Sequence, residues 1–305
     1  MDYCKPWLSL DEQADLLISR GLMGDRSAIS ECLRDVGYYR LSGYWYVFKT
    51  PDGSFRPATT IERVWDLYVF DRQLRLITLD AIERVEVFMR SRLAYYLADE
   101  TGVFGYLDRP SLPRLNQEDY LSFLKRCMDC YSRSREPFVD HFRQVYGDSC
   151  GMPPYWIMVN VMELGLLLRL YRGASNDVRA KIASELKTIP ALLDSWLLAL
   201  NTVRNICAHH GRLWNRPIGT KPKIPNTISD KRWHEPYKVE AERIFGMLTI
   251  LSYLLESIAP NTSWRERLLK HLNGRPSKDM ISMGFKEGWQ ECPFWKPWVE
   301  SSIEL

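Results

Sequence analysis

IERVWDLYVFDRQLRLITLDAIERVEVFMRSRLAYYLADET, residues 61–101, is the stretch that decides the fold of this 305-residue chain. Neither glycine nor proline interrupts it. At its start, Thr59 and Glu62 have the spacing of a capping box, in which two side chains bind the free N–H groups of a helix N-terminus. The pattern predicts a helix of up to about 40 residues, near 60 Å long if it is unbroken.

Helical patterns continue on both sides of this segment. Ser9 and Glu12 form another capping box, which opens a helix that ends at Gly21. A second helix follows Asp25 and ends at Gly37. Further helices are expected near residues 117–134, 154–172, 178–188, 190–210 and 235–259, with one or two short ones within 261–289.

One segment has the composition of a strand. Residues 38–48, YYRLSGYWYVF, are rich in aromatic side chains, and the turn signal Pro51-Asp52-Gly53 follows them. A small β-hairpin is therefore an option within residues 38–56. No other part of the chain supports a sheet, so the predicted fold class is all-α, a multi-helix bundle with a short N-terminal helical and aromatic extension.

The chain is expected to have three parts. Residues 1–58 form a helical and aromatic segment packed on the body, residues 59–260 form the main helical domain, and residues 261–305 form a C-terminal helical tail. No repeat or low-complexity linker divides the chain more clearly.

Composition places the chain among soluble globular proteins, with 46% hydrophobic and 26% charged residues. The 41 Lys and Arg against 38 Asp and Glu leave a net charge of +3, which argues neither for nor against nucleic-acid binding because only local clustering of charge matters. Seven scattered cysteines, an odd number, favour a reducing compartment over a disulfide framework.

Targeting signals are also missing from the pattern. The N-terminus lacks a basic segment followed by an apolar run, so we expect no secretory signal. The most apolar stretch, residues 156–171, contains Asn160 and Glu163 and falls short of the roughly 20 residues that cross a bilayer. We expect a cytoplasmic protein without a membrane partner.

The chemistry lies in residues 196–216, WLLALNTVRNICAHHGRLWNR, where an apolar helix turns polar. Asn201, Asn205 and His209 are one turn apart on one helix face. Arg204 lies about 140° around the helix from His209, at 3.6 residues per turn. Its long side chain can reach a shared cleft or the motif of a second subunit. Gly211 and Pro217 indicate that the helix ends shortly after the histidines.

These residue types suit metal-free cleavage of RNA. Histidine is a general acid or base near neutral pH, and arginine holds a phosphate through two donors. The ribose 2′-OH would supply the nucleophile, so neither a metal nor a cofactor is needed and DNA would not be cut. An ordinary alternative stays open, since His209 and His210 also suit a helix C-terminus, where the dipole favours cations.

Ordered blocks of residues along the chain carry a family resemblance. They are Lys5-Pro6 with Leu10 and Gln13, Tyr38-Tyr39-Arg40-Leu41-Ser42-Gly43-Tyr44, Asp71-Arg72-x-Leu74-Arg75, Ile82-Glu83-x-x-Glu86-x-x-x-Arg90, Pro154-x-Trp156, Glu163-Leu164-Gly165, and Arg204-Asn205-x-x-Ala208-His209-His210-x-Arg212-Leu213-Trp214-Asn215-Arg216. Through these blocks the chain resembles the Abi family of abortive-infection proteins, of the AbiD/AbiF type. The last block matches the R-x4-H signature of HEPN ribonucleases.

The resemblance implies a HEPN-type helical domain that dimerises, so that two R-x4-H motifs line one composite cleft. It implies a metal-independent endoribonuclease that acts as a toxin in antiphage defence, with RNA as its substrate and a small noncoding RNA as a further partner. Arg204 and His209 would be the catalytic pair. The residues expected to support them are Asn205, His210 and Asn201, and those expected to bind RNA are Arg212, Asn215, Arg216 and Arg40.

Some HEPN toxins carry a Glu-x3-Lys upstream of this motif. Glu86-x3-Arg90 is the nearest match here, with arginine in place of lysine, and Glu83 is an equal candidate. An ordinary ion-pair network on one helix is the alternative for all three residues. Cys127 and Cys130 form a lone C-x2-C, for which packing is favoured over a zinc site. Two other functions are kept beside the nuclease, namely a non-catalytic RNA-binding regulator and a phage-sensing interaction protein.

Overall fold

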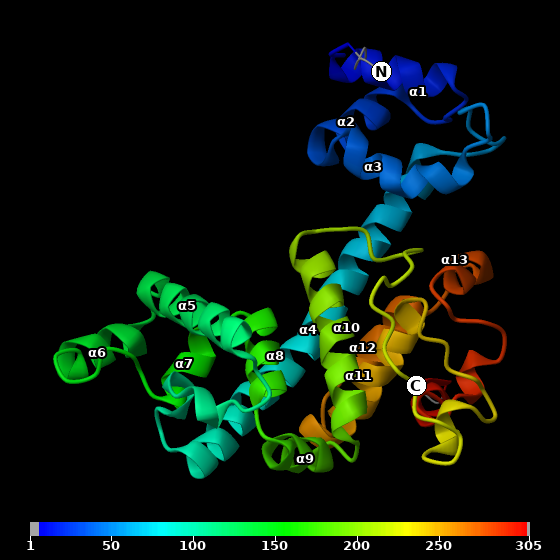
Figure 1. Cartoon of the computed structure of the whole chain (residues 1–305). Coiled ribbons are helices and arrows are strands. Elements are labelled where there is room, and N and C mark those ends of the chain that lie inside the picture. Colours follow the sequence, from blue (N-terminus) through cyan, green and yellow to red (C-terminus); the bar gives the residue numbers. More distant parts are fainter. Residues whose placement is uncertain (1–5, 304–305) are drawn as a thin grey trace. The chain divides into compact units, whose positions relative to one another are not determined.

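The computed structural model describes residues 6–303, and the chain divides into two compact units, residues 1–75 and residues 76–305 (Figure 1). Every regular element in the described part is a helix, and β-pairing there is limited to two isolated bridges, Met23–Thr60 and Lys49–Phe55. The predicted all-α fold is confirmed. The three-part division at residues 58 and 260 stays a prediction.

The elements of the two units follow in chain order. The first unit contains α1 (Leu10–Ser19), α2 (Arg26–Val36), α3 (Tyr38–Trp45), the 3-10 turn η1 (Tyr46–Phe48) and the first part of α4 (Ile61–Thr101). The second unit contains the rest of α4, η2 (Gly105–Leu107), η3 (Arg109–Ser111), α5 (Gln117–Arg133), α6 (Pro137–Tyr146), α7 (Tyr155–Val161), α8 (Leu164–Gly173), α9 (Asn176–Glu185), α10 (Pro190–Ala208), η4 (Lys231–Trp233), α11 (Ile244–Ile258), α12 (Trp264–Leu272), α13 (Ser277–Ser282), η5 (Trp289–Glu291) and α14 (Lys296–Ile303). Among the described helices, none combines the length and the apolarity that a membrane crossing requires.

The first two helices form as their end signals predict. At the start of α1, the N–H of Glu12 binds the Ser9 hydroxyl and the N–H of Ser9 binds the Glu12 carboxylate. The chain leaves α1 through Gly21, whose φ of +90° suits a residue without a Cβ. Helix α2 ends at Gly37 in the same way, at φ +85°. Both predicted helices are confirmed.

The strand that was an option within residues 38–48 does not form, because these residues form the helix α3 and the turn η1. Leu41, Tyr44 and Trp45 follow helical spacing and are all buried. Burial of this face outweighs the β-propensity of the aromatic side chains. The hairpin considered within residues 38–56 is reduced to the single antiparallel bridge between Lys49 and Phe55.

Helix α4 runs for 41 residues without a break, as predicted. Its cap lies one residue later than the capping box suggested. The Thr60 hydroxyl accepts the N–H of Arg63 at 3.2 Å, whereas the Thr59 hydroxyl donates to the carbonyl of Arg56.

A buried polar cluster joins α3 to α4 inside the first unit. Tyr44 donates its hydroxyl to the Asp71 carboxylate at 2.6 Å, and Arg75 pairs with the same oxygen. The Arg75 guanidinium also lies 3.2 Å from the Tyr44 oxygen. Burial and the neighbouring carboxylate raise the pKa of Tyr44, so the phenol stays protonated and remains a donor. The cluster ties together two sequence blocks that lie 27 residues apart.

The remaining part of α4 is the central support of the second unit. The indole of Trp264 on α12 donates to the carbonyl of Ile77 at 2.7 Å. Further along, Tyr96 donates to Glu185 at the end of α9. Between them, Arg90 contacts the segment that joins α7 to α8. This part of α4 therefore contacts α12, the connection between α7 and α8, and α9 at successive points along its length.

The single helix predicted over residues 154–172 is wrong, because the chain breaks into α7 and α8. Met162 has extended backbone angles between them. Carbonyls at a helix end lack partners within the helix. Here the guanidinium of Arg90 binds the carbonyls of Val159 and Met162, the latter at 2.7 Å, and so stabilises the break.

The helix predicted over residues 235–259 begins only at Ile244. The preceding backbone crosses the first turn of α11 so closely that a Cβ on Gly246 would stand 2.5 Å from the carbonyl oxygen of Glu240. This crossing holds residues 234–243 in an irregular path. The other predicted helices are confirmed within a few residues as α5, α9 and α10, and α12 and α13 are the two short helices expected in the tail, whereas α6 and α14 were not predicted.

The cluster around Asp71 gives a test of stability. Arg75→Ala removes the cation that contacts a fully buried carboxylate, so the free energy of unfolding should fall by about 3 kcal/mol. Tyr44→Phe removes a neutral donor and should lower it by about 1 kcal/mol. Urea denaturation measures both changes. Arg34→Ala, which removes an exposed pair with Asp35, is the control and should change stability by less than about 1 kcal/mol. Equal midpoints for Arg75→Ala and wild type would contradict a stabilising cluster.

Candidate active site

Helix α10 carries the polar motif at its C-terminal end. Pro190 opens the helix, a position where its missing N–H is harmless. One face of the helix is buried, and its members are Leu193, Trp196, Leu197, Ala199, Leu200, Val203 and Cys207. The helix packs against α8 and α9 and also against α11, in the middle of the second unit (Figure 1). This burial fixes the helix and leaves Asn205 and the histidines on its exposed side.

The helix ends with a paired cap at the two histidines. His209 is the capping residue, and its N–H binds the carbonyl of Asn205 at 3.0 Å. The N–H of His210 binds Cys207 and that of Gly211 binds Ile206, at 3.0 and 2.7 Å. These two bonds form a Schellman motif. The helix therefore ends at Ala208, directly before the two histidines, whereas the sequence predicted an end shortly after them.

The cap places histidine where glycine is usual. His210 has φ +57°, a left-handed conformation that disfavours most side chains by roughly 1–2 kcal/mol. Asn215, a few residues on, is left-handed as well at φ +49°. Asparagine and histidine tolerate this region better than most residues. Two of the predicted site residues therefore have an uncommon backbone conformation.

The motif residues lie in the last turns of α10 and at its cap. The Arg204 guanidinium lies 3.4 Å from the amide oxygen of Asn205, so the neighbouring amide helps to orient it. Asn205, His209 and His210 are exposed. Within the seven residues 204–210, the chain therefore carries a guanidinium, an amide and two imidazoles, which are groups able to bind a phosphate and to transfer protons.

The loop after the histidines is held firmly. Leu213 and Trp214 are buried, and Arg243 donates to the Asn215 side chain at 2.9 Å. The Arg216 guanidinium lies next to the cap: its Nη1 atom is 3.6 Å from the point where a Cβ on Gly211 would stand. Arg216 is thus brought to the helix end that carries the motif.

Farther along, Trp233 anchors the long connection between α10 and α11. Its ring is fully buried, 5.7 Å from that of Trp196 and 4.6 Å from that of Phe294 between ring centres. The Trp196 indole also donates to the carbonyl of Lys223 at 2.7 Å. The connection is therefore packed on the helix that carries the motif.

The other predicted site residues lie elsewhere on the scaffold. Asn201 lies on α10 against α8, where a Cβ on Gly165 would stand 3.6 Å from its side-chain nitrogen. Arg40 is exposed on α3 and belongs to the first unit. Arg212 is half-buried in the loop, and Glu83 is exposed on α4.

Glu86 and Arg90 form the ion pair that was the alternative to a catalytic role. Each side chain is only 15% exposed. Arg90 also binds the backbone between α7 and α8, two residues before α8 begins. The same short connection reaches Gly165, which meets Asn201 on α10. Met162, which Arg90 binds, and Gly165, which lies against Asn201, are thus three residues apart.

A comparison with family models gives one match, to a family described as Abi-like protein, over residues 31–215, more than half of the chain. The chain belongs to the Abi-like protein family. Curated proteins and solved structures compared with this Abi-like chain gave no match. Family membership indicates a role in abortive infection, a defence against phage.

The family region of this Abi-like chain contains several of the structural links described above. It begins in α2, includes the cluster around Asp71 and the contacts of Arg90, and ends at Asn215 with the polar motif. Arg243, which holds Asn215, lies beyond it. Sequence reasoning missed Arg243, because no pattern links residues 28 positions apart in an irregular segment.

Residues 6–303 contain no group of three or more His, Cys, Asp or Glu side chains placed to hold a metal ion. Cys127 is fully buried on α5, and burial raises the pKa of its thiol. A neutral buried thiol behaves as a small apolar side chain, which fits the packing role preferred for it.

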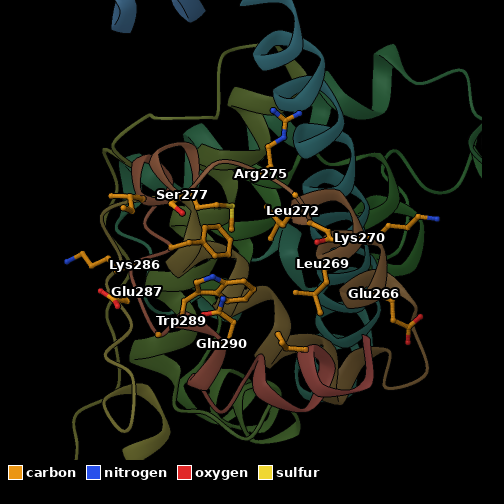
Figure 2. A pocket seen from close by; sticks show the side chains of 17 residues that line it. Glu266, Leu269, Lys270, Leu272, Arg275, Ser277, Lys286, Glu287, Trp289 and Gln290 are labelled. Atoms are coloured by element: carbon orange, nitrogen blue, oxygen red, sulfur yellow. The ribbon is translucent and has the colours of Figure 1, made fainter. Parts of the chain in front are cut away.

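A large cavity lies apart from the motif, in the C-terminal part of the Abi-like chain. Its volume is about 1160 Å³, and α12, α13 and η5 contribute most of its lining. Figure 2 shows Trp289 turned into the cavity, whereas the charged ends of Lys270 and Lys286 turn outward. None of the predicted site residues lines it.

The contacts of Arg90 predict how this Abi-like chain responds to a conservative change. Arg90→Lys keeps the charge beside Glu86 but loses the planar fork that also reaches the carbonyls of Val159 and Met162. The free energy of unfolding should fall by about 1–3 kcal/mol, measured by urea denaturation. Arg92→Lys, at a weak 3.8 Å pair with Glu185, is the matched control and should change little. If the two variants unfold alike, Arg90 does not stabilise the break.

Proposed function

We propose that this Abi-like protein is a metal-independent endoribonuclease of the HEPN class and AbiD/AbiF type, which cleaves RNA to abort phage infection. The observation that carries the proposal is the half-buried Arg204 beside the exposed Asn205, His209 and His210 at the capped end of a helix with one buried face. Catalytic groups on a firmly supported element keep the geometry that proton transfer requires.

The proposed chemistry uses the substrate's own nucleophile. The ribose 2′-oxygen bonds to the adjacent phosphorus while its proton passes to a base, and the bond from phosphorus to the 5′-oxygen breaks while that oxygen gains a proton. The products are a 2′,3′-cyclic phosphate and a 5′-hydroxyl. His209 transfers a proton and Arg204 binds the non-bridging oxygens, where negative charge grows. DNA lacks the 2′-OH and is not cut.

The proposed site is shared by two copies of the chain. On α10, Arg204 and His209 are five positions apart and so lie about 140° from each other around the helix. A two-fold contact near the end of α10 would set the arginine of one copy opposite the histidine of the other. RNA is the proposed substrate, with a small noncoding RNA as a further partner.

The first test is cleavage by point variants. Arg204→Ala and His209→Ala should each abolish cleavage of total RNA and growth arrest, because each removes a group that acts in the transition state. Cleavage by wild type should persist in EDTA. His141→Ala, which changes an exposed histidine on α6, is the control and should cleave normally.

The alternatives predict different results. RNA that co-purifies, seen as a raised ratio of absorbance at 260 and 280 nm, together with no cleavage by wild type, would favour an RNA-binding regulator. Protein free of RNA and without cleavage would favour an interaction protein that senses phage. Cleavage only in the presence of a divalent metal would contradict the proposal.

The second test addresses the shared cleft. Mixing Arg204→Ala with His209→Ala allows subunits to exchange, and each mixed dimer then holds one complete Arg–His pair across the interface. About a quarter of wild-type activity should return, since half of the dimers are mixed and one of their two sites is intact. If arginine and histidine act within one chain, the mixture stays inactive, which would contradict the composite site.

A further inference from the structure

Two helix ends of this chain share an unusual cap. Helix α10 ends with His210 at φ +57°, and α9 ends with Lys187 at φ +51°. At α9, the N–H of Lys187 binds Ser184 and that of Thr188 binds Ala183, at 2.9 and 3.0 Å, which repeats the bonding at the histidines. Both positions are the ones where helices most often have glycine.

The backbone conformation at position 210 does not by itself require a histidine. Glycine would form the same two hydrogen bonds without the steric penalty of a Cβ. Residues with strained backbone conformations cluster at active sites, so a non-glycine residue in such a conformation beside catalytic candidates suggests a functional role for its side chain. His210 is moreover exposed, so burial of its ring is no reason for its presence.

The left-handed conformation also changes the direction of the His210 side chain relative to that of His209. His209 still has right-handed angles, φ −88° and ψ 16°, whereas His210 is left-handed. In a continuing helix, His210 would point about 100° away from His209. Because His210 is left-handed, its side chain does not follow that 100° rotation. Both histidines are exposed at the end of the helix.

We infer that His210 is a second proton-transfer group of the site and works together with His209. This inference rests on the proposed ribonuclease function. The reaction needs two proton transfers, one from the 2′-OH as its oxygen attacks phosphorus and one to the 5′-oxygen as it leaves. One imidazole accepts the first proton while the other, protonated, donates the second, and exchange of protons with water restores both for the next turnover.

The experiment compares two matched glycine variants with wild type on total bacterial RNA. His210→Gly and Lys187→Gly make the same backbone change at the same kind of cap, but only the first removes an imidazole from the site. His210→Gly should lose cleavage by about 100-fold or more while its melting temperature does not fall. Lys187→Gly should cleave as wild type does.

Chemical rescue separates proton transfer from a structural role. Adding free imidazole should restore a measurable part of the cleavage by His210→Gly, because the small base replaces the missing ring, and should leave Lys187→Gly unchanged. Loss of activity without rescue would overturn the inference, and so would wild-type cleavage by His210→Gly. A wild-type protein that cleaves no RNA would instead refute the proposed function, and this inference with it.

Discussion

The guanidinium of Arg90 is the contact on which the arrangement of the second unit depends. It pairs with Glu86 on its own helix and binds two carbonyls where α7 ends. Without such donors, a break between α7 and α8 would leave backbone acceptors without partners. The break sets the start of α8, and α8 receives Asn201 of α10 at Gly165. One arginine thus connects the long helix α4 to the helix that carries the polar motif.

The sequence predicted correctly those helices whose length and ends are determined by residues near to each other in the chain. The length of α4 follows from the absence of glycine and proline, and the caps of α1 and α2 follow from Ser9 and Gly37. The errors arose where distant residues decide. The face of α3 that carries Tyr44 is buried, with Asp71 accepting the Tyr44 hydroxyl, and the backbone before α11 crosses its first turn at Gly246. Such contacts leave no periodic trace in a single sequence.

The candidate site shows the same division. The identity and spacing of Arg204, Asn205 and His209 marked it in the sequence, and the end of the helix was expected close by. The left-handed backbone of His210 was not expected, because Gly211 stood next to it as the more probable residue for that conformation. The return of Arg216 to the cap depends on a loop path that composition does not determine.

The anchoring of the loop after the histidines has a consequence for the order in which the protein is made. Ribosomes release the polar motif before Trp233 and Arg243, which pack on its helix and hold its loop. Chains fold during synthesis as their segments emerge. The helix end that presents the two imidazoles therefore gains its support only after a further stretch of chain has left the ribosome, so a polypeptide that stops at the end of the family region carries the whole motif without the residues that hold it in place.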